Sequence, residues 1–195
     1  NKNFNMIKLR SMVADADKSG VDSTASNDLR ITAVGGWVRK FKLDELTQLI
    51  NVFKGEMSLV GPRPNVLTET QLYSQEEIKL LSVKPGITDF ASIVFSDEGE
   101  ILKNSEDPDL KYNQLIRPGK NYLGIFYINN SSLLLDISLC FITIIAIVSR
   151  PKALSLLNII LRKLNASDKL IDIALRVKPL KPMAPPGLSD IIRSR

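Results

Sequence analysis

The segment from Phe41 to Pro64 constrains the fold of this 195-residue chain more than any other part of it. Its apolar residues recur at helical spacing, which predicts a helix with one buried apolar stripe, made of Leu43, Leu46, Leu49, Ile50 and Phe53. The helix should end near Gly55, because glycine is common just beyond a helix C-terminus. Two prolines then fix the backbone on either side of Arg63. The segment therefore predicts a helix followed by a rigid turn.

Two acidic residues, Asp44 and Glu45, open this predicted helix. The free N–H groups of a first helical turn favour carboxylates there, so the pair has an ordinary structural explanation. Adjacent helical residues point about 100° apart, which also lets the two carboxylates serve separate roles. A Pro-Arg-Pro turn is ordinarily just a turn. It suits a phosphate if its guanidinium faces the acidic pair.

Composition excludes several classes of function. The chain has no histidine, which rules out Ser-His-Asp catalysis and His-ligated zinc. A net charge of +5 indicates an anionic partner such as a nucleotide, a phospholipid surface or a nucleic acid. Aromatic residues are only 6% of the chain and are not interleaved with basic ones, so we expect no binding to single-stranded nucleic acid.

The most hydrophobic part of the chain spans residues 133–149. Its uninterrupted portion, from Ile137 to Val148, falls short of the roughly 20 apolar residues that cross a bilayer. We therefore predict a buried or interfacial helix there. Asp136 precedes this portion, either as an ordinary charge at a helix N-terminus or as a carboxylate held by a nearby cation.

From Arg150 onward the chain is basic, and apolar residues again recur at helical spacing, at Leu154, Leu157, Ile160, Leu161 and Leu164. Such helices often lie in a membrane interface. Packing of this helix on the protein's own core is the alternative. We predict two units, a catalytic domain at 1–149 and a basic, amphipathic, membrane-associated segment at 150–195. An amphipathic helix is also predicted within residues 65–82.

Four stretches carry a resemblance to a known family: LDEL, QLINV and KGEMSLVGPRP within residues 43–64, and KPGIT at 84–88. Together they resemble the bacterial sugar transferases, the monotopic polyprenol-phosphate phosphoglycosyl transferases. The resemblance covers roughly residues 4–150 and departs from the family after Thr88, where this chain reads DFAS. It does not include the family's N-terminal membrane helix. We expect an N-terminally truncated domain that binds nucleotide-sugar but transfers poorly to membrane-borne lipid.

The resemblance implies a role for each candidate residue. Asp44 would be the nucleophile, and Glu45 would act beside it and hold Mg²⁺. The residues implied in contacts with substrate phosphate are Lys8, Arg10, Arg39, Arg63 and Asp136. The residues implied in the nucleotide-sugar pocket are Gly61, Pro62 and Pro64.

The implied fold is α+β and mostly helical, a small compact catalytic domain with interfacial amphipathic helices. The implied reaction moves a sugar-1-phosphate from a UDP-sugar to polyprenol phosphate through an aspartyl-phosphosugar intermediate and releases UMP. It would be the first membrane step of a bacterial surface glycan, at the membrane surface on the cytoplasmic face of the inner membrane. Two alternatives come from other classes: a non-catalytic membrane-surface module with a basic C-terminal tail, and a nucleotide- or nucleic-acid-binding regulator.

Overall fold

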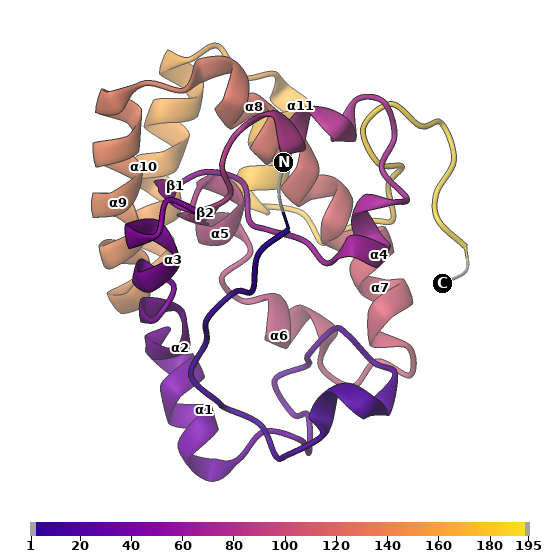
Figure 1. Ribbon diagram of the computed structural model, residues 1–195. Coiled ribbons are helices and arrows are strands. Elements are labelled where there is room, and N and C mark those ends of the chain that lie inside the picture. The colour runs from indigo at the N-terminus through magenta and orange to yellow at the C-terminus, as the bar shows by residue number, and fades with distance from the viewer. Residues whose placement is uncertain (1–2, 194–195) are drawn as a thin grey trace.

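The computed structural model describes residues 3–193, without the side chains of residues 17 and 19. The fold is α+β and mostly helical, as predicted (Figure 1). Its helices, two 3₁₀ helices (η) and two strands are, in chain order, η1 (Ala16–Ser19), α1 (Ala33–Lys40), α2 (Leu43–Leu46), α3 (Leu49–Phe53), β1 (Ser58–Val60), α4 (Leu67–Thr70), η2 (Glu77–Ser82), β2 (Gly86–Thr88), α5 (Phe90–Val94), α6 (Glu98–Leu102), α7 (Pro108–Leu115), α8 (Arg117–Asn130), α9 (Leu133–Val148), α10 (Arg150–Lys163) and α11 (Asp168–Leu175).

The core forms where α5 and α8 to α11 pack together, in the upper part of Figure 1. The short helix α5 lies at its centre and contacts α8, α9, α10 and α11. Its residues Phe90, Ile93 and Val94 are fully buried or nearly so. Helices α1 to α3 lie lower in this view and contribute no residue to this core, whereas α6 contributes the fully buried Leu102.

The apolar face predicted for residues 154–164 packs inward. Leu154, Leu157 and Leu161 of α10 are buried against α9, α11 and α5. Two of the basic residues in this part of the chain are engaged as well, because Arg176 and Arg150 both form ion pairs with Asp97. These leucines serve the protein's own core, and membrane association of segment 150–195 stays a prediction.

The predicted helix over residues 43–53 is divided into α2 and α3, and its apolar stripe is on the outside. Leu43, Leu46, Leu49, Ile50 and Phe53 are all exposed, Phe53 by 96%. The buried residues of the two helices are instead polar: Asp44, Gln48 and Asn51. The prediction of a buried apolar stripe is therefore wrong. Helical periodicity shows that a helix has an apolar face, but it does not show whether that face packs against the protein core or meets another apolar environment.

Helix α9 has the same two-sided character. Leu135, Leu139 and Ile142 face the core, while a second stripe is exposed, made of Leu134, Ile137, Phe141, Ile144 and Val148. The predicted helix is present, with 16 residues. In residues 3–193, no helix has both the length and the hydrophobicity to cross a membrane.

The prediction of an amphipathic helix within residues 65–82 is also wrong. The segment forms only α4 and η2. Of its apolar residues Leu67, Leu72, Ile78, Leu80 and Leu81, only Leu80 is buried. The fully buried residue Glu77 anchors η2 instead, since Asn121 donates to its carboxylate and Arg117 pairs with it.

The two strands fix the turn that carries Arg63. Strands β1 and β2 pair in parallel, with Ser58 opposite Gly86 and Val60 opposite Thr88. Just beyond β1, the Gly61 N–H donates to the Thr88 carbonyl at 2.9 Å. The Gly61 and Gly86 backbones pass so closely that a Cβ on Gly86 would lie 2.1 Å from the Gly61 nitrogen. Glycine at both positions lets the turn lie against β2.

The buried polar face of α2 and α3 gives a first prediction. Gln48 is 1% exposed and its Nε2 has no hydrogen-bond partner among the described residues, whereas Asn51 bonds Ile7, Asn5 and Glu56. A buried donor without a partner costs about 1–3 kcal/mol. We expect Gln48→Met to raise the free energy of unfolding by about 1 kcal/mol, and the matched Asn51→Leu to lower it. Urea unfolding followed by circular dichroism measures both. Equal destabilisation by the two substitutions would contradict this account.

Candidate active site

One large cavity, of about 1020 Å³, brings together the candidate residues from four parts of the chain. Lys8 comes from the N-terminal segment, Arg39 from the last turn of α1, Asp44 and Glu45 from α2, and Arg63 from the turn after β1. Pro62 lines the same cavity. The cavity therefore brings two candidate carboxylates together with three candidate cations.

The central contact is an ion pair between the turn and α2. Arg63 Nη1 donates to Glu45 Oε1 at 2.8 Å, and both side chains are mostly buried. Burial disfavours the charged form of Glu45, but Arg63 and Lys42 outweigh it, so the pKa of Glu45 lies below its ordinary value. Arg63 stays charged in the same way, because Glu45 overcomes its burial and raises its pKa. The guanidinium faces the acidic pair, as a phosphate site requires.

Asp44 differs from its neighbour because no Lys or Arg within residues 3–193 forms an ion pair with it. The residue is 9% exposed, and its Oδ1 is buried without a hydrogen-bond partner among the described residues. A buried carboxylate oxygen without a partner is costly and is unusual outside functional sites. Of the two carboxylates, Asp44 is thus the one available to a reacting group.

The N-terminal segment reaches the cavity through side-chain hydrogen bonds. Asn51 accepts from the Ile7 N–H at 3.0 Å and donates to the Asn5 carbonyl at 2.9 Å, while the Thr47 hydroxyl donates to the Ile7 carbonyl at 3.0 Å. These bonds place Lys8 at the cavity. Desolvation there and the Arg63 guanidinium lower the pKa of Lys8 to about 8.

The cavity also contains a second charged group that the sequence did not single out. Lys120 of α8 forms an ion pair with Glu98 of α6 and lies over the Tyr112 ring, 5.1 Å from its centroid. All three line the cavity. Burial opposes ionisation of Glu98, yet Lys120 and Arg63 lower its pKa. The only signal in the sequence was an acidic stretch at 96–113, which is equally typical of a surface loop.

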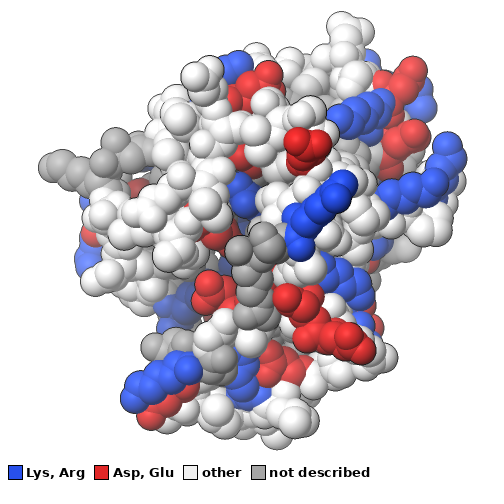
Figure 2. Space-filling model, turned by 90° about the vertical axis from the view of Figure 1, so that its right-hand side faces the viewer, with Lys and Arg blue, Asp and Glu red and all other residues white. Residues whose placement is uncertain are grey.

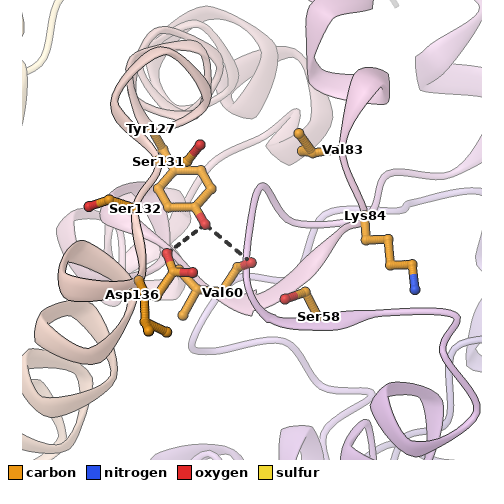
Figure 3. A pocket seen from close by; sticks show the side chains of 9 residues that line it. Ser58, Val60, Val83, Lys84, Tyr127, Ser131, Ser132 and Asp136 are labelled. Atoms are coloured by element: carbon orange, nitrogen blue, oxygen red, sulfur yellow. Dashed lines mark hydrogen bonds between the residues drawn. The ribbon is translucent and has the colours of Figure 1, made fainter.

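Four predicted residues do not line this cavity: Arg10, Gly61, Pro64 and Asp136. Arg10 is exposed. Gly61 supports the turn through its backbone, and Pro64 closes the same turn. Asp136 lines a separate pocket of about 370 Å³ with Lys84 and accepts from the Tyr127 hydroxyl at 2.7 Å (Figure 3). Their implied roles stay predictions.

The donor atoms suit a magnesium ion that shares its shell with a substrate. Within residues 3–193, no group of three or more Cys, Asp or Glu residues is placed to hold a metal by itself. Mg²⁺ is commonly bound by one or two carboxylates plus substrate phosphates and water. The carboxylate of Glu45 fits that description.

The surface charge bears on the nucleic-acid alternative. On the face shown in Figure 2, acidic and basic side chains are intermixed and form no continuous basic stripe. Nucleic-acid binders ordinarily present such a stripe. This face gives that alternative no support.

Sequence comparisons show the family of this chain. The profile of the family described as bacterial sugar transferase matches residues 1–150. An undecaprenyl-phosphate glucose phosphotransferase of Komagataeibacter xylinus is 38% identical over 152 residues, which are 74% of this chain and 26% of that protein. An undecaprenyl-phosphate galactose phosphotransferase of Salmonella typhimurium is 38% identical over 132 residues, covering 68% of this chain and 24% of that protein.

A third relative, a UDP-N-acetylgalactosamine-undecaprenyl-phosphate N-acetylgalactosaminephosphotransferase of Aeromonas hydrophila, is 33% identical over 152 residues, 76% of this chain and 33% of that protein. This chain belongs to the bacterial sugar transferase family. It spans about a quarter to a third of the length of these three relatives.

The lowered pKa of Lys8 gives a pH prediction. Below pH 8 its ammonium is charged and attracts a phosphate, whereas above pH 8 the free protein has lost that proton and binding must take one up. We expect the affinity for UMP to fall about tenfold between pH 7 and pH 9. Isothermal titration calorimetry at both pH values measures this change.

Lys8→Arg is the matched control, because arginine stays charged throughout this range. Its affinity for UMP should change much less with pH than that of the natural protein. Parallel pH profiles for the two proteins would show that Lys8 does not contact the phosphate.

Proposed function

We propose that this protein transfers a sugar-1-phosphate from a UDP-sugar to polyprenol phosphate, the first membrane step of a bacterial surface glycan. The proposal rests mainly on one observation. A buried Asp44 oxygen without a hydrogen-bond partner among the described residues lies at the same cavity as the ion pair between Glu45 and Arg63. The names of the relatives support the class of acceptor and the transfer of a sugar phosphate.

The chemistry divides into two displacements. An Asp44 oxygen attacks the β-phosphorus of the UDP-sugar, a new P–O bond forms, and UMP leaves with the electrons of the broken diphosphate bond. An oxygen of polyprenol phosphate then attacks the same phosphorus, and the Asp44 carboxylate is released. Lys8, Arg39 and Arg63 stabilise the negative charge on the phosphoryl oxygens in both steps.

Magnesium would enter at the acidic pair. Glu45 would hold the ion together with substrate oxygens and water, and the charge of the ion would neutralise the diphosphate and assist the departure of UMP. Arg63 keeps the Glu45 carboxylate ionised for this purpose. In a direct reaction, the two anionic substrates would have to be bound at the same time and would repel each other. The two-step route avoids this repulsion, because UMP leaves before polyprenol phosphate attacks.

The exposed apolar stripes suit a protein that meets its acceptor at a membrane. We define the apolar face as the exposed large apolar residues within 33–53 and within α9: Val34, Trp37, Phe41, Leu43, Leu46, Leu49, Ile50, Phe53, Leu133, Leu134, Ile137, Phe141, Ile144, Ile147 and Val148. Both groups lie on the left of Figure 1, and α3 and α9 both contact β1. We propose that this face enters the bilayer interface, on the cytoplasmic side of the inner membrane.

The covalent step predicts a specific adduct. After incubation with a panel of UDP-sugars and Mg²⁺ but no lipid, intact-mass spectrometry should find one sugar phosphate on the protein, located at Asp44. Asp44→Asn should carry none, and chelation of Mg²⁺ should slow its formation. Asp168→Asn, an exposed carboxylate on α11, is the control and should label like the natural protein. Unmodified protein with every donor would refute the two-step scheme.

The apolar face predicts membrane binding that can be read from Trp37, the single tryptophan of the chain. Its emission should shift to shorter wavelength when phospholipid vesicles are added, because the side chain is 67% exposed. Phe53→Glu and Phe141→Glu should each weaken vesicle binding at least tenfold, since a buried Phe contributes about 1.5–3 kcal/mol.

Val177→Glu provides the control, because Val177 is 80% exposed and lies outside the apolar face. It should bind vesicles like the natural protein. Equal effects of the three substitutions would overturn the assignment of this face. The non-catalytic alternative predicts vesicle binding without any Asp44 adduct.

A further inference from the structure

The cavity contains two groups of charged side chains. Around the acidic pair it is lined by the cations Lys8, Arg39, Lys42 and Arg63, which suit the diphosphate of a donor. The second group in the same cavity is made of Glu98, Lys120 and Tyr112. The positive charge of Arg63 acts on both groups, because it lowers the pKa of Glu45 and of Glu98. Since all these residues line one cavity, a donor whose diphosphate lies on Arg63 shares that cavity with Glu98.

Glu98 is built to accept hydrogen bonds. Lys120 Nζ binds its Oε2 and is held in turn over the Tyr112 ring. The Glu98 side chain keeps 31% of its surface exposed at the cavity, while that of Lys120 keeps 15%. An ionised carboxylate with only one oxygen engaged by its partner repels phosphate and accepts from hydroxyl groups.

We propose that Glu98, positioned by Lys120, accepts hydrogen bonds from the hydroxyl groups of the donor's sugar and thereby selects which sugar is transferred. The inference rests on the proposed function and adds a recognition residue to the same site. Sites that hydrogen-bond a substrate hydroxyl discriminate strongly against analogues without it, because the polar group of the protein is then left unpaired.

The test is the rate of adduct formation on Asp44 with UDP-hexoses and their monodeoxy analogues. Glu98→Gln should slow labelling by the preferred donor about 10- to 100-fold, the usual range for a hydrogen bond to a charged group. With the deoxy donor that lacks the contacted hydroxyl, the natural protein and the variant should react at equal rates. If Glu98→Gln slowed labelling by the same factor with every deoxy donor as with the preferred donor, the proposal would be overturned.

Binding of UMP tests whether Glu98 contacts the transferred sugar or the ribose. The affinity for UMP should be the same in Glu98→Gln as in the natural protein, because UMP has no transferred sugar. A matching loss of UMP affinity would show that Glu98 acts on the ribose or through Arg63, which would also overturn the proposal. Glu106→Gln, an exposed carboxylate outside the cavity, should change neither measurement.

The double variant Glu98→Gln/Lys120→Met is a control for misfolding, because it does not leave the Lys120 ammonium without its partner carboxylate. It should fold and should also have lost the discrimination between hexose and deoxyhexose donors. Retained discrimination in a folded double variant would refute the inference. Absence of any adduct in the natural protein would instead refute the proposed function.

Discussion

The ion pair between Arg63 and Glu45 is the contact on which the rest of the site depends. It joins the turn after β1 to α2. The close approach of Gly61 to Gly86 keeps this turn against β2. The pairing of β1 with β2 holds the turn, and the helices around α5 hold the sheet. The core therefore serves mainly to fix one guanidinium relative to one pair of carboxylates.

A second constraint is the reversed burial in α2 and α3. Their polar residues Asp44, Gln48 and Asn51 are buried, and their large apolar residues are exposed. In water such helices would lose most of the free energy that apolar burial usually contributes. The arrangement is understandable if the exposed apolar residues meet lipid, because transfer of these side chains from water to lipid would restore that contribution.

The sequence predicted the fold class, the apolar helix at 133–148 and the meeting of Arg63 with the acidic pair, because these follow from periodicity and from a long family signature. It failed at α2 and α3, where periodicity identifies an apolar face but not its environment. It also failed at residues 65–82, where the buried pair of Glu77 with Arg117 overrides the apolar pattern. Glu98 and Lys120 were missed because 22 residues separate them and only the fold brings them together.

The exposed apolar residues of α2 and α3 fall into two groups: Leu46 and Leu49 line the cavity beside Asp44, whereas Leu43, Ile50 and Phe53 are exposed and do not line it. Polar replacements confined to Ile50 and Phe53 leave every hydrogen bond of Asn51 in place and change no residue that lines the cavity. Such variants should need less detergent for handling while the lining of the catalytic cavity stays the same.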